Sequence, residues 1–189
     1  KIIIIEDNCE SLGSRLKGKY LGTFGDYGSY SFYYSHQITS GEGGMVTCNK
    51  KEDYDILFAL RSHGWLGGTR FYKRNLRLYN TYAKNNPKLD PRYIFVNSGF
   101  NLRPTDIQAA IAHNQFKRLN TLKKQRNSNR NLIIEKVLKS KKWNNQFEFI
   151  IPPKNIEPSW MGLPILLSEK YKNKKQKFIN FLDDKGIET

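Results

Sequence analysis

Residues 31–44 read SFYYSHQITSGEGG, which is an aromatic run, a polar stretch with one histidine, and a Gly-Glu-Gly-Gly turn. Aromatic residues favour strands, so residues 29–34 predict a short strand and residues 45–48 a second strand that returns beside it. The glycines between the strands predict a tight turn, because glycine adopts positive φ at little cost. His36 stands in this turn, although a single histidine among aromatic residues is more often packed than catalytic.

The opening residues Lys1–Glu6 read KIIIIE and predict a fully buried strand. Two carboxylates, Asp7 and Glu10, follow its end, a common place for site residues in α/β folds. Taken alone, these acids fit a general acid–base pair, a metal site or, most often, solvated loop residues. They therefore define a candidate site that needs further support.

The rest of the chain predicts alternating strands and helices and then a smaller α+β part. Pro104 stands where proline commonly opens a helix. The expected elements are a helix over 53–63, a long loop over 64–97, a helix from 104 that breaks near Asn114 or Asn120, a basic helix to 138, strands over 147–151 and 160–167, and a helix over 171–185.

The net charge of +15 over 189 residues, with a pI near 9.8, would usually suggest nucleic acid or a membrane surface. Much of the charge lies in residues 117–142 and 170–177, where lysines alternate with Asn, Gln and Ser on predicted helices, a pattern typical of solvated faces. No stretch approaches the roughly 20 apolar residues of a membrane span. We expect no nucleic-acid or membrane partner, and a basic surface that attracts an acidic substrate.

Cys9 and Cys48 are the only cysteines. Their wide spacing predicts neither a disulfide framework nor a zinc site, so we expect no metal. An iron–sulfur cluster needs about four cysteines and is not expected either. A reducing, cytoplasmic location is the default for such a chain.

Four segments follow one another in a specific order: IEDNCESLGS at 5–14, GTFGDYGSYSFYYSHQITSGEGGMVTCN at 22–49, ALRSHGW at 59–65 and SGFNLRPTDIQAAIA at 98–112. Together they resemble the DegT/DnrJ/EryC1/StrS family of sugar aminotransferases, over residues 2–135 and more weakly to the end. The resemblance implies an α/β fold, namely a fragment of a fold-type I enzyme dependent on pyridoxal phosphate, with a three-layer, mostly parallel sheet and helices. We expect residues 1–113 to be the C-terminal part of the large cofactor-binding domain. Residues 114–189 would be the connecting helix and part of a small α+β C-terminal domain.

The resemblance also implies roles for single residues. Asp7 resembles the carboxylate that pairs with the pyridine nitrogen, and Glu10 stands where many members carry a glutamine beside the 3-oxygen of the cofactor. Ser31 resembles the residue whose hydroxyl helps to hold the phosphate. Asn101 resembles the asparagine that reaches the cofactor phosphate of a neighbouring subunit, and Arg103 is expected near the substrate. The family therefore implies a homodimer with shared active sites.

Position 36 departs from the family pattern. Most members read SFxxxKxxxxGEGG, and the lysine forms an internal Schiff base with the cofactor. Here the residue is His36, and no lysine occurs between Lys19 and Lys50. Imidazole has no primary amine and cannot form an imine, but it moves protons near neutral pH. This replacement, together with Trp160 in PSWMGLP, resembles the nucleotide-sugar 3-dehydratases of 3,6-dideoxysugar synthesis.

That subgroup implies 3-dehydration of a 4-keto-6-deoxy nucleotide sugar, with either GDP or CDP as the nucleotide. Pyridoxal 5'-phosphate and pyridoxamine 5'-phosphate would be the cofactor forms, glutamate the amino donor and His36 the catalytic acid and base. Two alternatives stay open. One is a nucleotide-sugar aminotransferase that works without this lysine, and the other is a non-catalytic paralogue or basic binding module in which the lysine has drifted.

Overall fold

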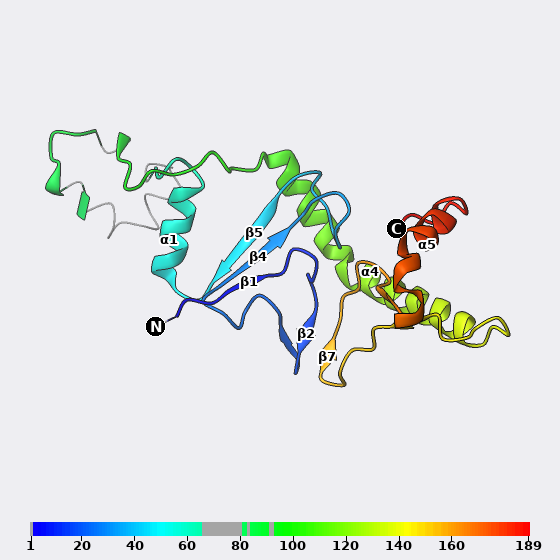
Figure 1. Ribbon diagram of the computed structural model, residues 1–189. Coiled ribbons are helices and arrows are strands. Elements are labelled where there is room, and N and C mark those ends of the chain that lie inside the picture. The colour runs from blue at the N-terminus through cyan, green and yellow to red at the C-terminus, as the bar shows by residue number, and fades with distance from the viewer. Residues whose placement is uncertain (1, 66–80, 83, 91–92) are drawn as a thin grey trace.

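The computed structural model describes residues 2–65, 81–82, 84–90 and 93–189. The first part of the chain forms a three-stranded sheet. Its strand order is β1 (Ile5–Asp7), β4 (Tyr27–Ser31) and β5 (Gly44–Cys48). β1 and β4 are parallel, whereas β4 and β5 are antiparallel. In Figure 1 the carboxyl ends of β1 and β4 point toward α4 (Asp106–Leu138), and α1 (Lys51–Leu60) lies at the opposite end of the sheet. The strands expected at 29–34 and 45–48 and the helix expected at 53–63 are confirmed.

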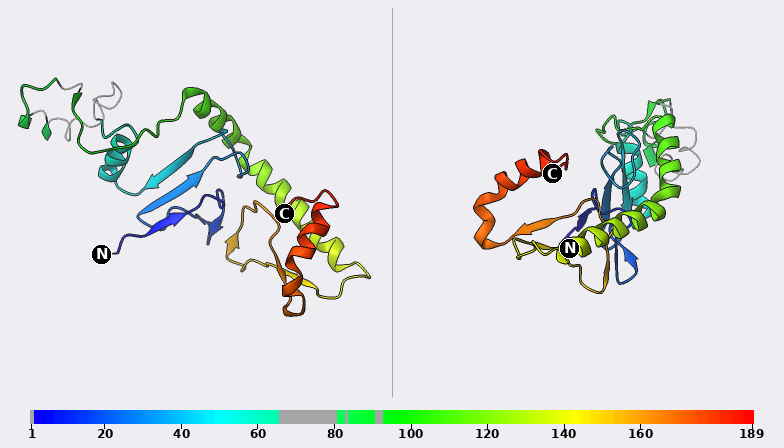
Figure 2. Two further views of the ribbon diagram at one scale, coloured as in Figure 1. Left: turned by 45° about the horizontal axis from the view of Figure 1, so that its top comes forward. Right: turned by 90° about the vertical axis from the view of Figure 1, so that its right-hand side faces the viewer.

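The second part of the chain contains short elements. β2 (Arg15–Leu16), β3 (Lys19–Tyr20) and β7 (Ile156–Glu157) form one small sheet, and β6 (Phe147–Phe149) pairs with β8 (Ile165–Leu167). The chain continues through η2 (Glu169–Lys174) into α5 (Lys175–Asp183). Figure 2 shows α5 standing away from the strands of the first sheet. The two-residue strands were not predicted, because two residues are too few to show any periodicity.

The expectation of a fully buried first strand is wrong. β1 begins only at Ile5, and the isoleucine side chains before and within it are exposed, at 86% for Ile2 and 69% for Ile5. β1 is an edge strand of its sheet, and the described part of the chain leaves more than half of each of these side chains exposed. An apolar run indicates that a segment must be buried, but it does not indicate which other part of the structure covers it.

The expected helix break near Asn114 or Asn120 is also wrong, because α4 is continuous over 33 residues. The sequence of α4 contains neither Gly nor Pro, and asparagine costs well under about 1 kcal/mol in a helix interior. A capping box opens the helix: the Thr105 side chain accepts from the Gln108 N–H, and the Gln108 side chain accepts from the Thr105 N–H. The expected domain boundary at 113/114 falls inside α4, and that division stays a prediction.

One face of α4 turns inward although it carries several cations. Lys123 Nζ donates to the Gly13 carbonyl at 2.9 Å, and Arg126 donates to the His36 carbonyl at 3.4 Å. Arg130 is buried, donates to the Ile150 carbonyl and stacks its guanidinium over the Trp160 ring at 4.3 Å. The prediction that the basic charge of α4 is solvated is therefore wrong for these three side chains. None of the described helices is long and apolar enough to cross a membrane.

The core joins the sheet to this helix. Leu12, Tyr30, Ile38 and Leu119 form one buried cluster, and Phe32 and Leu122 pack against it. Its members come from the loop after β1, from β4, from the turn after β4 and from α4. Folding therefore brings the turn that contains His36 against the loop that contains Glu10.

Glu6 anchors the GTFGDYG loop on one face of the sheet. Its carboxylate accepts hydrogen bonds from the backbone N–H groups of Gly22 at 2.7 Å, Phe24 at 2.5 Å and Gly25 at 2.6 Å. Burial raises the pKa of Glu6, but these three hydrogen bonds and Lys19 more than offset that effect, so the pKa is lowered overall. The anionic form of Glu6 is thus the form that stabilises the fold.

Replacing Glu6 by Gln tests this anchor, because the substitution keeps the shape and removes the charge. The stabilisation from Glu6 should be complete above the unfolded-chain pKa of about 4.3 and lost as the pH falls through the lower folded-state value. We expect Glu6→Gln to lower the free energy of unfolding by about 1–2 kcal/mol near neutral pH, measured by urea denaturation. The difference from wild type should shrink below about pH 4.

Glu148→Gln is the matched control, because Glu148 is exposed in the middle of β6. This variant should unfold like the wild type at neutral pH. A Glu6→Gln difference that is absent at neutral pH, or that persists undiminished in acid, would contradict the assigned role of the Glu6 carboxylate.

Candidate active site

The carboxyl ends of β1 and β4 bring polar side chains together on one face of the sheet. Asp7 is the register partner of Ser29, and Ser31 lies on the same face of β4 as Ser29 because side chains alternate along a strand. Asp7 Oδ1 accepts from the Cys9 N–H at 3.1 Å and lies 3.4 Å from Ser29 Oγ. The Glu6 side chain lies on the opposite face, because side chains alternate along β1. The Glu6 carboxylate, which anchors the loop, is therefore separated from the Asp7 carboxylate, which is available to a ligand.

Asp7 is held in its ionised form. The Cys9 thiol and backbone N–H lower the pKa of the Asp7 carboxyl, and Ser29 adds to the effect, while burial opposes it. Asp7 is exposed, so its charge is accessible. The same contact with Asp7 raises the pKa of the Cys9 thiol, which favours the neutral thiol. The edge of the sheet therefore presents one anion beside neutral hydroxyl and thiol groups.

Backbone hydrogen bonds between its two ends close the turn that follows β4. The Phe32 N–H donates to the Gly43 carbonyl, and the Ser40 N–H donates to the Phe32 carbonyl, both at 2.9 Å. Gly41 has a φ of 82° and Gly43 a φ of 151°, so two glycines of the GEGG run adopt conformations that other residues rarely take. Gln108 Nε2 at the start of α4 donates to the Glu42 carbonyl at 3.2 Å. The predicted tight turn is confirmed.

His36 lies half-buried within this closed turn. Its backbone N–H donates to the Tyr33 carbonyl at 3.1 Å, and its ring contacts the Tyr33 ring edge-on, with the ring centroids 5.9 Å apart. His36 Nδ1 is buried and has no hydrogen-bond partner among the described residues. A buried, unpaired nitrogen is uncommon in a folded protein, and side-chain atoms of Gln37, Arg61, Asn127 and Arg130 share this state with His36 in the described residues.

Gln37 and Ile38, the two residues after His36, are each only 2% exposed. Gln37 Nε2 donates to the Glu10 carbonyl and, at 3.2 Å, to the Ser159 carbonyl. These contacts connect the turn after β4 to the loop after β1 and to a segment more than 100 residues downstream. No pattern in the sequence distinguishes a buried glutamine such as Gln37 from a solvated one.

The structure brings some of the predicted site residues together and leaves others apart. Ser31 Oγ accepts from the Tyr33 N–H at 3.3 Å, which places it at the start of the turn that carries His36. Glu10 is exposed, and its backbone adjoins Gln37. Asn101 and Arg103 are exposed on a different segment.

That segment runs beside the end of α1 rather than beside the turn after β4. Phe100 N–H donates to the Leu60 carbonyl at 2.6 Å, and Leu102 N–H donates to the Arg61 carbonyl at 2.9 Å. Asn101 also forms an isolated β-bridge with Ser62. Within this chain, Asn101 is therefore placed at the end of α1, whereas Asp7 and Ser31 lie at the carboxyl ends of β1 and β4 and His36 lies in the turn that follows β4.

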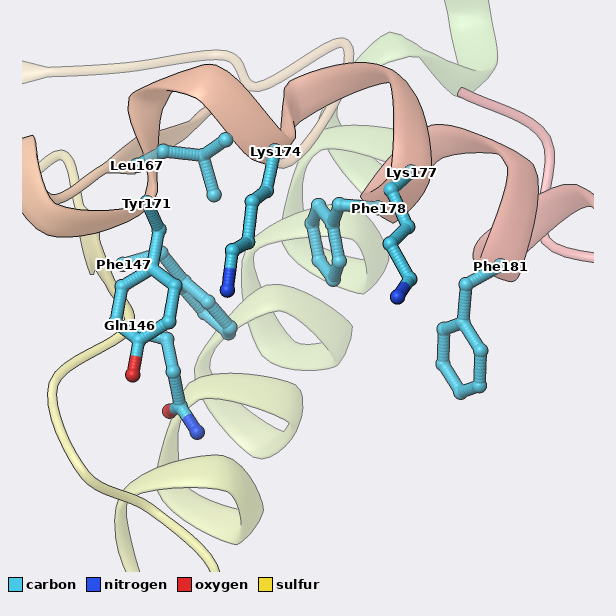
Figure 3. A pocket seen from close by; sticks show the side chains of 8 residues that line it. All are labelled: Gln146, Phe147, Leu167, Tyr171, Lys174, Lys177, Phe178 and Phe181. Carbon is cyan, nitrogen blue, oxygen red and sulfur yellow. The ribbon is translucent and has the colours of Figure 1, made fainter.

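A pocket of about 370 Å³ lies elsewhere, among β6, β8, η2 and α5 (Figure 3). Its lining is mainly aromatic and aliphatic, with the side chains of Lys174 from η2 and Lys177 from α5 projecting on either side of Phe178. The lining residues are Gln146, Phe147, Leu167, Tyr171, Lys174, Lys177, Phe178 and Phe181. None of them is a predicted site residue, so the polar cluster around Asp7 and His36, rather than this hollow, is the candidate active site.

The fold and this polar cluster define a class of protein. The chain belongs to the DegT/DnrJ/EryC1/StrS aminotransferase family, whose model matches residues 1–189. A similar relative is GDP-4-keto-6-deoxy-D-mannose 3-dehydratase of Yersinia pseudotuberculosis, which is 34% identical over 189 residues, corresponding to 99% of this chain and 45% of the relative. The chain therefore spans less than half the length of that relative.

Two solved structures are similar over 99% of the chain. The E. coli GDP-4-keto-6-deoxy-D-mannose-3-dehydratase with bound hydrated PLP has a TM-score of 0.77 at 28% identity, and this chain covers 45% of it. A GDP-4-keto-6-deoxymannose-3-dehydratase with a trapped PLP-glutamate geminal diamine has a TM-score of 0.72 at 27% identity, with 46% covered. These similarities confirm the predicted fold class, with the chain as a part of the longer fold, although among the strand pairs of the described residues only β1 and β4 are parallel.

Two glycines of the GEGG run provide a test of the turn. A Cβ on Gly44 would lie 2.6 Å from the Tyr30 carbonyl oxygen, whereas a Cβ on Gly41 would meet nothing within 4 Å. Gly41→Ala should cost about 1–2 kcal/mol, because only its positive φ is unfavourable. Gly44→Ala should cost more, since β4 and β5 must separate to relieve the clash. Urea denaturation measures both, and equal losses would contradict the close strand approach.

Proposed function

We propose that this chain contributes to the active site of an enzyme that removes the C3 hydroxyl of a 4-keto-6-deoxy nucleotide sugar, with His36 as the acid and base. The observation that carries the proposal is the placement of His36. It lies in the turn that follows the carboxyl end of β4, with a buried and unpaired Nδ1, near the strand edge that presents the ionised Asp7. Similarity to two 3-dehydratases supports the reaction class.

The donor set at the sheet edge fits a pyridoxal-type cofactor. We assign the Asp7 carboxylate to the pyridine nitrogen, because an adjacent anion keeps that nitrogen protonated. Ser31 would donate its hydroxyl to the phosphate, and Glu10 would lie beside the 3-oxygen. The lowered pKa of Asp7 supports this assignment, since a neutral carboxyl could not stabilise a pyridinium ion.

When bound, the pyridoxamine form would supply an amine for the 4-keto group and a ring that stabilises the electron pair left by proton removal, and that pair would then expel the C3 hydroxyl. His36 accepts a proton from the reacting carbon at a ring nitrogen and delivers it to the departing hydroxyl oxygen. An imidazole suits both steps, because the same ring nitrogen can accept a proton and then donate it. Imidazole also leaves the cofactor untethered, since it lacks a primary amine.

The remaining partners follow from the same reaction. We assign glutamate as the amino donor, in line with the glutamate adduct in one similar structure. The nucleotide is GDP in the named relatives, and Arg103 is the residue that we place near the substrate. We place the reaction in the cytoplasm, where Cys9 and Cys48, both free thiols, would stay reduced.

We further propose a homodimer in which Asn101 acts in the active site of the partner copy. Asn101 is paired with the segment at the end of α1 rather than with the turn that carries His36. The apolar side chains around it are open, with Phe100 at 61%, Leu102 at 67% and Ile107 at 74% exposed. An exposed apolar surface around a ligand-binding asparagine suits a contact with a second copy.

His36→Asn tests the proposed chemistry, because Asn keeps a polar side chain but cannot exchange protons. We expect C3 deoxygenation of a GDP-4-keto-6-deoxy sugar by the full-length protein, with pyridoxal phosphate and glutamate, to fall by about 10²–10⁴-fold. The absorbance of bound cofactor should be retained, since Asp7 and Ser31 are unchanged.

His63→Asn is the matched control, because His63 is exposed and its φ of 63° is one that Asn tolerates. It should deoxygenate like the wild type. An unchanged rate for His36→Asn would contradict the proposal. A stable 4-amino sugar as the product would assign the protein as an aminotransferase, and the absence of any absorbance change with pyridoxal phosphate would favour a binding module.

Mixing two inactive full-length variants tests the shared site. If Asn101 acts in the partner copy, mixed dimers of His36→Asn and Asn101→Ala contain one intact site. Random reassembly makes half of the dimers mixed, so about a quarter of the wild-type activity should return. The activity is measured after the two variants are dissociated and reassembled together.

His36→Asn mixed with Asp7→Asn is the control pair. Both residues belong to the same copy's site in this account, so each site of the mixed dimer carries one defect and no activity should return. Recovery in the control pair, or no recovery with Asn101→Ala, would contradict the proposed arrangement.

A further inference from the structure

We infer that Gln37 is the positioning residue for His36, an inference that rests on the proposed role of His36 as acid and base. The two residues are consecutive, but their environments differ sharply. Gln37 is 2% exposed and its Nε2 is bonded to two other segments, although its Oε1 is unpaired, whereas His36 is half-buried and its Nδ1 is unpaired. The backbone of the turn is thus fixed at position 37, directly beside the reacting side chain.

The imidazole of His36 lacks an anchor of its own. Acid–base histidines are usually oriented by a hydrogen bond to the second ring nitrogen, which fixes both the tautomer and the ring direction. His36 Nδ1 has no such bond to any residue in the described ranges. Its ring contact is the edge-on Tyr33 ring, 5.9 Å away, and Tyr33 is itself exposed. The position of the imidazole therefore depends on the backbone that carries it.

Glutamine suits position 37 because one nitrogen carries two donor hydrogens. Gln37 Nε2 contacts the carbonyl of Glu10, in the loop that follows Asp7, and the carbonyl of Ser159, beside Trp160. A single amide group thus joins the His36 turn to the loop next to Asp7 and to the C-terminal part of the chain. This link sets the spacing between the acid–base residue and the carboxylate that we assign to the cofactor.

Arg126 of α4 supports the same turn from another side. It donates to the carbonyl of His36 itself at 3.4 Å, while the N–H of His36 is bonded to the Tyr33 carbonyl. Arg126 is only partly buried and makes a longer hydrogen bond. We therefore assign Gln37 the larger and Arg126 the smaller share in holding the backbone of His36.

The test compares Gln37→Met with Ser14→Ala in the full-length protein. Methionine matches the length of glutamine but has no donor, so it releases both carbonyls. Ser14 Oγ accepts from the Ser159 N–H at 2.9 Å, so Ser14→Ala weakens the support of the Ser159 segment but leaves both hydrogen bonds of Gln37 in place. Both variants should lower the melting temperature.

Of these two variants, only Gln37→Met should change the position of the His36 imidazole. We expect its kcat to fall by about 10–100-fold with little change in KM, because the displaced imidazole is misaligned for proton transfer. The ring signal of His36 in the NMR spectrum of the cofactor-free protein, assigned with His36→Asn, should shift or broaden. In Ser14→Ala both kcat and the ring signal should match the wild type.

Arg126→Met covers the case in which Gln37→Met does not fold, and it should show the same two effects at smaller size. An unchanged ring signal and kcat in whichever of these two variants folds would overturn the inference, as would equal effects in Ser14→Ala. The proposed function fails separately, if His36→Asn itself keeps full activity. The NMR comparison needs no reaction and so tests the positioning role by itself.

Discussion

The burial of Gln37 and Ile38 is the constraint on which the candidate site depends. Ile38 belongs to the core cluster with Leu12, Tyr30 and Leu119, and Gln37 is bonded to backbone on two sides. Together they force the turn after β4 to lie against the loop after β1. His36, next to Gln37, is therefore held in a turn that contacts the loop following Asp7, although no described residue bonds its Nδ1.

α4 extends this arrangement to the C-terminal part of the chain. Side chains along one face of the helix donate to the carbonyls of Gly13, His36, Pro158 and Ile150. A buried carbonyl without a partner costs about 1–3 kcal/mol, so long cationic side chains that reach such carbonyls stabilise irregular segments that lack a ladder of their own. Part of the high positive charge of this chain thus serves internal hydrogen bonding rather than a surface for an acidic partner.

The sequence was sufficient to predict the features that depend on local conformation. The strands around the GEGG turn follow from aromatic residues and glycines, and Gly41 and Gly43 do adopt positive φ. The exposure of β1 was not predictable, because an isoleucine run specifies no covering element. The expected break in α4 does not occur, because asparagine lowers helix propensity too little to end a helix in a segment free of Gly and Pro.

The site residues likewise divide into those that the sequence predicts and those that it does not. Asp7 and His36 stood out because of the segments around them, and the structure brings their segments together. Glu6 was missed, since alternation along β1 decides which of two adjacent carboxylates faces the GTFGDYG loop. Gln37 was missed because its role depends on Ser159, which is 122 residues away in the sequence. Long-range hydrogen bonds to backbone carbonyls leave no local pattern.

The central claim is that the protein holds its cofactor through Asp7 and Ser31 while His36, rather than a lysine, faces the reacting atoms. Borohydride reduction of the full-length protein with bound pyridoxal phosphate, followed by mass spectrometry of its peptides, tests this claim most directly. The account predicts that the cofactor is released on denaturation and that no lysine carries a reduced phosphopyridoxyl group. A lysine labelled in proportion to the bound cofactor would contradict it.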